Sequence, residues 1–310
     1  MPDLNRDLTF ASFLFPKAAE GVGLLEQAVL AERLGYDLVA VPDHADWPHY
    51  VDGWTLAAAV IGRTTSIEVF SGVSALALRE PPAVLGKAAW SLDRIAPGRF
   101  HLGIGTGALP GITSIGGPEW AGRESVDRLR EAIEVIRILW SGKEEASYEG
   151  TYYTLREAKL PDAPTPGLDI WIGGVKRGMR RLTGQVADGW FPGYLNIDPD
   201  PVIEETKHLD EEILAAGRQL SDVRRVYNTI AKKVQTKSEG FLIGPASQWI
   251  EELTWAALEL GFDTFLLGDR DTTVAGLQRF AEDIIPAVKA NVAAARAGAA
   301  TISSVATARG

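Results

Sequence analysis

The sequence predicts an α/β fold, a single (β/α)8 TIM barrel, on three observations. Short apolar runs typical of strands alternate with amphipathic stretches typical of helices. Eight such βα pairs follow one another, and the 310 residues, 46% of them hydrophobic, match the size of one barrel. Because the strands of such a barrel are parallel, we expect their carboxyl ends to meet at one mouth, lined by the loops that follow them.

The predicted strands are short and mostly apolar, as strands buried on both faces of a parallel sheet should be. A helix is expected after each of them. In chain order the strands are Leu8–Leu14, Leu38–Pro42, Ile67–Gly72, Arg99–Ile104, Asp169–Gly173, Gly189–Pro192, Val223–Ile230 and Thr264–Leu267.

Helices are predicted where apolar residues recur about every 3.6 positions. The apolar stripe after the first strand stops at Gly35, and glycine readily adopts the left-handed conformation that ends many helices. Two later helices, Glu124–Trp140 and Gln248–Leu260, also finish beside glycines, Gly142 and Gly261. These glycines therefore mark helix ends.

Two stretches depart from the simple repeat. Ala108–Arg123 is a glycine- and proline-rich loop directly after the fourth strand, so we expect it to form part of a pocket wall. Residues 142–168 contain a β-hairpin with its turn centred on Glu149-Gly150, which we interpret as an insertion. Residues 1–291 are thus predicted as one domain, whereas Val292–Gly310, rich in small and polar residues, is expected to be disordered.

Composition excludes several functions. The formal net charge of −10 argues against a nucleic-acid partner, because phosphate backbones demand clustered Lys and Arg. The absence of cysteine excludes disulfides, thiolate metal ligands and cysteine nucleophiles, and no motif typical of a metal site is present. Met1–Arg6 lacks the apolar segment of an export signal, and no apolar run approaches about 18 residues. We expect a cytoplasmic protein that acts on a small molecule, away from membranes.

The most informative motif is Gly98–Gly107, a predicted strand that ends in the turn Gly105-Thr106-Gly107. A turn without bulky side chains lets backbone N–H groups approach a phosphate or a planar cofactor closely. Taken alone, the same pattern also occurs in ordinary loops that bind nothing. Its meaning therefore depends on the motifs around it.

Five further motifs accompany this turn along the chain. They are Val41-Pro42-Asp43-His44, Gly72-Val73, Tyr148–Tyr153, Ile170–Gly174 and Ala187–Trp190. Together the motifs resemble the luciferase-like superfamily of flavin and deazaflavin oxidoreductases, over Leu8 to about Val288. The greatest similarity is to the branch that uses coenzyme F-420, with methylene-tetrahydromethanopterin reductase and sugar-phosphate dehydrogenases.

The resemblance implies hydride transfer between F-420 and a small organic substrate at the barrel mouth, by a homodimer. Two alternatives stay open. One is a monooxygenase that uses reduced FMN and oxygen, because such enzymes share the barrel and most of the glycines. The other is a barrel that binds a cofactor without turnover.

The resemblance also implies a catalytic pair after the second strand. The matching histidine, His44, carries the proton, and the matching aspartate, Asp43, contacts the cofactor. A structural alternative is that Asp43 caps the next helix and His44 packs beside it. The resembled sugar-phosphate dehydrogenases place a catalytic glutamate directly after the Gly-Thr-Gly turn, where this chain has Ala108. Oxidation of a sugar phosphate by that acid and base is therefore not expected.

For the cofactor ring, the resemblance implies a cis peptide bond at Gly72-Val73. For the phosphate, it implies Thr106 and Gly107 together with the turn Gly173-Gly174-Val175-Lys176, which opens the predicted helix Arg177–Val186. Backbone N–H groups at the start of a helix favour an anion.

The start of this helix is basic, which is unfavourable for the helix itself. Lys176, Arg177, Arg180 and Arg181 cluster there in an otherwise acidic chain. A bound anion, such as a phosphate or an oligoglutamate tail, would explain the cluster, and a solvated basic face is the alternative.

Aromatic residues lie at or just after several predicted strand ends, namely Phe13, Trp47, Trp120 and Trp190. Their rings could form an apolar wall for an organic substrate, although tryptophan is at least as often core filler. We assign Phe13, Trp47 and Trp190 to substrate binding.

Overall fold

The computed structural model describes residues 3–21, 23–107, 111–120, 122–160, 162–193, 199–230, 232–268 and 273–307. Eight parallel strands form the barrel, which confirms the predicted fold class, and each lies within one residue of the predicted start. They are β1 (Thr9–Phe13), β2 (Leu38–Val41), β3 (Glu68–Ser71), β5 (Phe100–Gly105), β8 (Ile170–Gly173), β9 (Gly189–Phe191), β10 (Arg224–Asn228) and β13 (Thr264–Leu267).

The barrel closes because its first and last neighbours pair. Hydrogen-bonded neighbours follow the order β3-β2-β1-β13-β10-β9-β8-β5, and β3 also pairs with β5 through Val69 and Phe70. The short β4 (Ser74–Ala75) extends the edge beside β5, and β11 (Lys233–Val234) pairs with β12 (Ile243–Gly244) outside the barrel.

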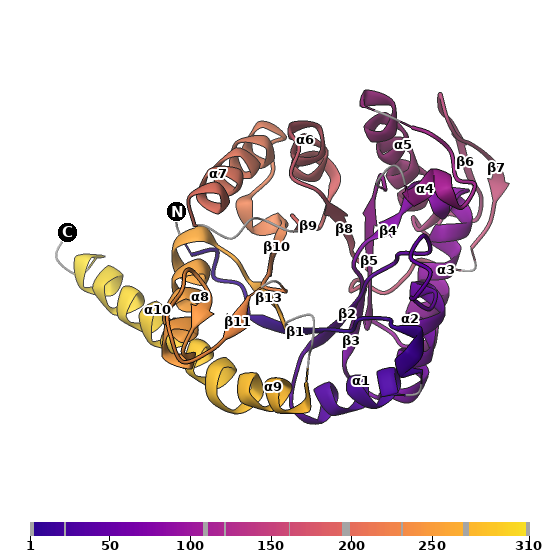
Figure 1. The fold of residues 1–310 in the computed structure, drawn as a ribbon. Helices are drawn as coiled ribbons and strands as arrows, with labels where there is room; N and C mark the ends of the chain where they lie inside the picture. The colour runs from indigo at the N-terminus through magenta and orange to yellow at the C-terminus, as the bar shows by residue number, and fades with distance from the viewer. Residues whose placement is uncertain are drawn as a thin grey trace.

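Helices surround the strands as a ring (Figure 1). Two of the predicted helix ends are confirmed, since Gly35 and Gly261 adopt positive φ of 81° and 69° after α1 and α8. Short 3-10 turns cover Ala18–Glu20, Leu76–Leu78 and Leu220–Asp222, and a π-helical turn covers Phe280–Ile284. The α-helices are α1 (Gly23–Arg33), α2 (Gly53–Arg63), α3 (Pro82–Ile95), α4 (Gly111–Ser114), α5 (Arg123–Leu139), α6 (Arg177–Val186), α7 (Pro199–Ala215), α8 (Ala246–Leu260), α9 (Val274–Arg279) and α10 (Ile285–Thr307). None of the helices in the described ranges combines the length and the apolar character that a bilayer crossing requires.

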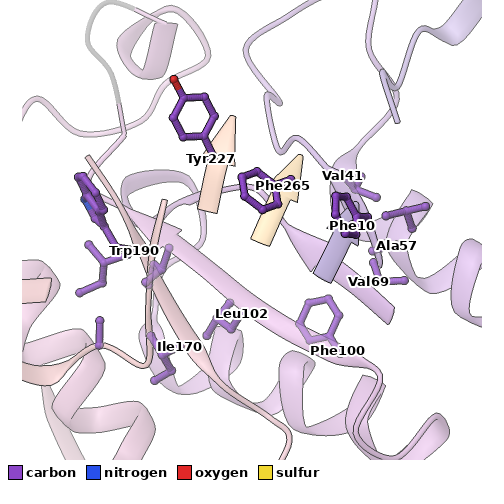
Figure 2. Packing of buried hydrophobic residues seen from close by; sticks show 14 of the residues in the cluster. Phe10, Val41, Ala57, Val69, Phe100, Leu102, Ile170, Trp190, Tyr227 and Phe265 are labelled. Atoms are coloured by element: carbon purple, nitrogen blue, oxygen red, sulfur yellow. The ribbon is translucent and has the colours of Figure 1, made fainter. Parts of the chain in front are cut away.

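Side chains of alternate strand residues fill two separate cores. One set, including Val69, Phe100 and Leu102, packs between the strands and the helices (Figure 2). The other set fills the inside of the barrel, and its aromatic members are Phe13, Phe70, Trp171 and Phe191. The barrel interior is therefore a packed core, which leaves the mouth as the place for a ligand.

Glycines on the strands make room for these interior rings. A Cβ on Gly103 would lie 1.8 Å from the carbonyl oxygen of Ser71 and 2.5 Å from the ring of Phe70. A Cβ on Gly189 would lie 2.6 Å from the indole of Trp171. The interior thus alternates large rings with residues that have no side chain.

The predicted hairpin insertion is present as β6 (Ala146–Glu149) and β7 (Thr154–Ala158). Its turn lies slightly later than predicted, over residues 150–153, where the N–H of Gly150 donates to the carbonyl oxygen of Tyr153 at 2.9 Å. The cause is Glu131 of α5, whose carboxylate accepts the N–H groups of Thr151 and Tyr152 at 2.9 and 2.8 Å.

The prediction of disorder does not hold for residues 292–307, which continue α10, and residues 308–310 lie outside the described part of the chain. Val292 is 1% exposed within the outer core, and Arg296 donates to the carboxylate of Asp3 at 2.6 Å. The small residues that indicated disorder are mostly alanines, which have the highest helix propensity. Once the first turns of α10 are packed, such a sequence continues the helix.

Gly103→Ala should lower the free energy of unfolding by about 3 kcal/mol, because the added Cβ collides with backbone and with Phe70. Gly62→Ala is the matched control. An added Cβ on this exposed residue of α2 meets nothing within 4 Å, so the change should be neutral or stabilise by up to about 1 kcal/mol. Urea unfolding followed by circular dichroism measures both. Equal stability of the two variants would contradict the described interior packing.

Candidate active site at the barrel mouth

A cavity of about 1040 Å³ opens at the mouth, between the carboxyl ends of β5 and β8 and the first turns of α5 and α6. The two turns predicted for a cofactor phosphate meet in it, although 67 residues separate Thr106 from Gly173 in the sequence. Trp120 and Gly122 of the long loop form part of its wall, as expected. The predicted residues that line it are Thr106, Gly107, Gly173, Gly174, Val175 and Lys176.

The third predicted turn joins the other two through Val73. The peptide bond Gly72-Val73 is cis, as the resemblance implies. A Cβ on Gly173 would lie 2.8 Å from Cγ2 of Val73, and one on Gly105 would lie 3.3 Å from the same atom. Val73 therefore occupies the space that glycines leave open at the ends of β5 and β8.

The cavity is strongly basic. Arg123 and Arg130 of α5 face it from one side, and Lys176 and Arg181 from the start of α6 face it from the other. Arg123 pairs with Asp127, which also lines the cavity, at 3.1 Å. In the described part of the chain, Arg130, Lys176 and Arg181 have no hydrogen-bond or ion-pair partner. An anion would compensate them.

The predicted basic cluster is only partly assembled. Arg180 turns away from the cavity, since it is largely buried and bonds to Glu205 and to the carbonyl oxygen of Val175. Arg177 lies with Arg181 at a separate, smaller depression on the outer side of α6. Arg123 was predicted only as the end of the loop in the pocket wall, and Arg130 was not predicted, although their spacing of seven residues places them on one face of α5.

Asp43 is buried and held by an arginine. Arg79 donates to both of its carboxylate oxygens, at 2.9 and 2.5 Å, and also to Asp52 at 2.5 Å. Asp43 does not cap the next helix, which was the structural alternative. The N-cap of α2 is Asp52, whose carboxylate accepts the N–H of Thr55 at 2.8 Å. Sequence reasoning missed Arg79, because it lies 36 residues from its partner and belongs to no motif.

His44 lies at the same mouth but is open to solvent. Its side chain is 45% exposed, its Nδ1 is 3.5 Å from the carboxylate of Asp46, and its ring stacks on Trp47 with centroids 4.6 Å apart. Trp47 is itself 46% exposed and contacts the ring of Tyr50. His44 and Trp47 are not among the described residues that line the large cavity, since they follow β2 and the cavity adjoins β5 and β8.

The structure divides the predicted aromatic wall. Phe13 belongs to the interior of the barrel, near the mouth end of β1, with its ring 4.6 Å from that of Phe15. Trp190 does not line the mouth, and this assignment is corrected. It is fully buried between strands and helices (Figure 2), and its Nε1 donates to the carbonyl oxygen of Gly174 at 3.0 Å. The next residue, Phe191, points into the barrel instead, because neighbouring strand residues face opposite sides.

His101 lies at the opposite end of the barrel from the mouth, near the start of β5. Its Nε2 is 2.9 Å from the carboxylate of Glu68, and its ring stacks on Trp171. Nearby, burial raises the pKa of Asp169, and the charge of His101 opposes that rise. These contacts give His101 a structural role at the closed end of the barrel. Among the described residues, no cluster of three or more His, Asp or Glu is arranged to hold a metal ion.

A model of the luciferase-like monooxygenase family matches residues 16–232. The chain is 35% identical over 208 residues to an F420-dependent glucose-6-phosphate dehydrogenase of Microbacterium testaceum, covering 64% of this chain and 61% of the relative. It is 27% identical over 316 aligned positions to the enzyme of the same name from Beutenbergia cavernae, covering 86% and 93%. The solved structure of an F420-dependent secondary alcohol dehydrogenase in complex with an F420-acetone adduct has the same fold, with a TM-score of 0.77 at 21% identity over 91% of this chain and 99% of that one.

Arg79→Met should destabilise the protein by about 3–5 kcal/mol, because it leaves the buried carboxylate of Asp43 without a cation. The matched control is Arg63→Met, which breaks an exposed pair with Glu26 and should cost at most about 1 kcal/mol. Thermal and urea unfolding at neutral pH compare the two. A loss no larger than that of the control would show that Arg79 does not compensate Asp43.

The same variant changes the response to acid. Burial alone would raise the pKa of Asp52, but hydrogen bonds from Arg79 and Thr55 lower it below its ordinary 3.8. Because the folded-state pKa is lowered, this stabilisation is present above the ordinary value and is lost as the pH falls below it. In Arg79→Met the carboxyl carbon of Asp52 should titrate at higher pH by NMR than in the parent protein. An unchanged titration would contradict the ion pair.

Proposed function

Because the chain belongs to the luciferase-like monooxygenase family, we propose that it is an oxidoreductase that uses coenzyme F420 and a small organic substrate. The observation that carries the proposal is the basic cavity, in which two glycine turns from distant parts of the chain meet beside cations that pair with none of the described residues. The F420-dependent names of the curated relatives support the choice of F420 over FMN.

The residues present fit an anionic deazaflavin cofactor. Lys176 and Arg181, with the free N–H groups of the first turn of α6, would hold its phosphate. Gly107 and Gly174 bring backbone rather than side chains to the cavity surface, which allows a close approach. The cis turn at Val73 lies next to both β5 and β8 and would support the ring.

When bound, F420 would supply or accept a hydride, so the protein must move a proton. We assign this proton to His44, whose imidazole can exchange it with solvent because nearly half of the side chain is exposed. Asp46, 3.5 Å from Nδ1, orients the ring, and Trp47 stacks on its face. Asp43 acts indirectly, since its ion pair with Arg79 fixes the backbone just before His44.

The substrate class we propose is a small, uncharged organic molecule. The curated relatives are named for glucose 6-phosphate, but Ala108 stands where the resembled sugar-phosphate dehydrogenases carry their second acid. The exposed indole of Trp47 offers an apolar surface beside His44. Reduction of an activated C=C or C=N bond and oxidation of a secondary alcohol both need only one proton carrier. The expected homodimer stays a prediction.

F420 binding should depend on the cavity cations. In a fluorescence titration, Lys176→Gln combined with Arg181→Gln should weaken binding of F420 by about tenfold or more, since each loses a charged contact to an anion. Lys237→Gln, an exposed cation that is not among the described residues lining the cavity, is the control and should bind as the parent does. A deazaflavin without phosphate and tail should bind all three proteins equally. Tighter binding of reduced FMN, with oxygen consumed on adding substrate, would instead favour a monooxygenase.

His44→Ala should retain F420 binding and lose turnover by about 10²- to 10⁴-fold, the range usual for a general acid or base. Turnover is followed by the absorbance of F420 with a panel of secondary alcohols, cyclic imines and activated alkenes. His208→Gln on α7, away from the mouth, is the control. Equal rates for His44→Ala and the parent would remove His44 from the mechanism. Binding without turnover by the parent on the whole panel would favour a cofactor-binding barrel.

A further inference from the structure

Trp120 is the aromatic residue in the wall of the basic cavity, and an arginine covers its ring. The guanidinium of Arg128 lies over the Trp120 indole, 4.6 Å from its centroid. The same guanidinium lies 4.4 Å from the centroid of the Tyr152 ring. Arg128 therefore stacks on two aromatic rings, one from the cavity loop and one from the turn of the hairpin insertion.

Arg128 is fixed over the two rings by a neighbouring carboxylate, and it differs from the cations that face the cavity. Its Nε donates to the carboxylate of Glu124, one helical turn earlier on α5, at 2.9 Å. It is not among the described residues that line the cavity, unlike Arg123 and Arg130 on the same helix. Its contact with a ligand in the cavity would therefore pass through Trp120.

Trp120 depends on such a partner because its own backbone is not part of a helix or strand. Residues 115–120, as described, form a turn followed by irregular chain between α4 and α5. The side chain of Trp120 is partly buried against the outer core, and the guanidinium of Arg128 lies over its ring. The attraction between a cation and an indole ring is strong enough to favour one orientation of the side chain over others.

The hairpin in turn is fixed to α5 by carboxylates. Glu131 accepts the N–H groups of Thr151, Tyr152 and Tyr153 at 2.9, 2.8 and 3.3 Å. A Cβ on Gly150 would lie 2.3 Å from this carboxylate. The turn can therefore pack around Glu131 only because position 150 is a glycine.

A second tether reaches the barrel itself. The hydroxyl of Tyr153 donates to the carboxylate of Glu80 at 2.6 Å, and burial together with Glu80 raises the pKa of Tyr153, which keeps the donor protonated. Glu80 follows Arg79, the residue that holds Asp43. The turn of the hairpin is thus attached at two places and presents Tyr152 in a fixed position.

We propose that the hairpin insertion positions Trp120 through Arg128, so that Arg128 is a positioning residue that sets one wall of the cofactor cavity. The proposal rests on the proposed function for the identity of the ligand. The contacts of Tyr152 with Arg128 and of Arg128 with Trp120, by contrast, are properties of the protein alone. Trp120 is the wall, Arg128 fixes its ring, and Tyr152 fixes Arg128.

The first test needs no ligand. The protein carries nine tryptophans, and incorporation of 5-fluorotryptophan gives each a fluorine resonance. The resonance of Trp120 is identified by its loss in Trp120→Phe. Arg128→Met and Tyr152→Ala should shift and broaden this resonance, whereas Arg156→Met, an exposed arginine on β7 of the same hairpin, should leave it unchanged. An unmoved Trp120 resonance in Arg128→Met would overturn the proposal.

The second test measures F420 affinity in a double-mutant cycle. Arg128→Met and Trp120→Ala should each weaken binding by about threefold to tenfold, and the double variant should bind no more weakly than Trp120→Ala. Arg128→Lys should recover part of the loss, because it restores a cation over the ring. Arg128→Met could instead weaken F420 binding as much in Trp120→Ala as in the parent protein. That result would overturn the proposal, since Arg128 would then act on the ligand directly.

Failure of the proposed function is separable from failure of this inference. A parent protein that does not bind F420 contradicts the proposed function, and the cycle is then repeated with FMN. Melting temperatures of all variants identify any that fail to fold. In that case the cycle uses Trp120→Phe and Arg128→Lys, the more conservative changes at the same two positions. A folded set that shows no coupling with either ligand contradicts the positioning role.

Discussion

The structure depends on the packing of large side chains into spaces left by glycine. Inside the barrel, Phe70 lies against Gly103, and Trp171 lies against Gly189, at distances that exclude any Cβ on those glycines. Phe70 also contacts Trp171, with ring centroids 4.5 Å apart. A barrel of eight strands has room for side chains but not for a channel, so these rings fix how closely the strands approach.

The same packing continues to the mouth, where it creates the site. Val73 fits against Gly105 and Gly173 in the way that Phe70 fits against Gly103. This contact draws three strand ends together, and their turns then present backbone to the cavity. The cavity exists because the strands end in residues without side chains, while the residues that give it charge come from the helices behind.

Much of this could be predicted from the sequence, because local signals carry it. The apolar runs gave the strands and their order, and the glycine turns gave six residues of the cavity lining. Contacts between distant residues carry no such signal. Arg79 reaches Asp43 from another βα unit, and the side of the strand that Trp190 faces depends on register, which shifts by one residue without changing the composition.

The expected disorder after Val292 failed for a related reason. Alanine-rich sequence is compatible with both helix and disorder, and the choice depends on whether a preceding segment is packed. In this chain Val292 is buried in the outer core and Arg296 reaches Asp3 near the opposite end of the sequence. Neither contact is visible in local composition.

Arg130, Lys176 and Arg181 of the cavity, which have no partner among the residues that the structure describes, belong to a protein whose formal charge is −10. In a cellular medium, charges more than about 8 Å apart are largely screened, so the cavity acts only on what has come close to it. The positive charge of the cavity and the negative charge of the whole chain therefore act over different distances. A cationic pocket can exist in an acidic protein because its charge is felt only inside it.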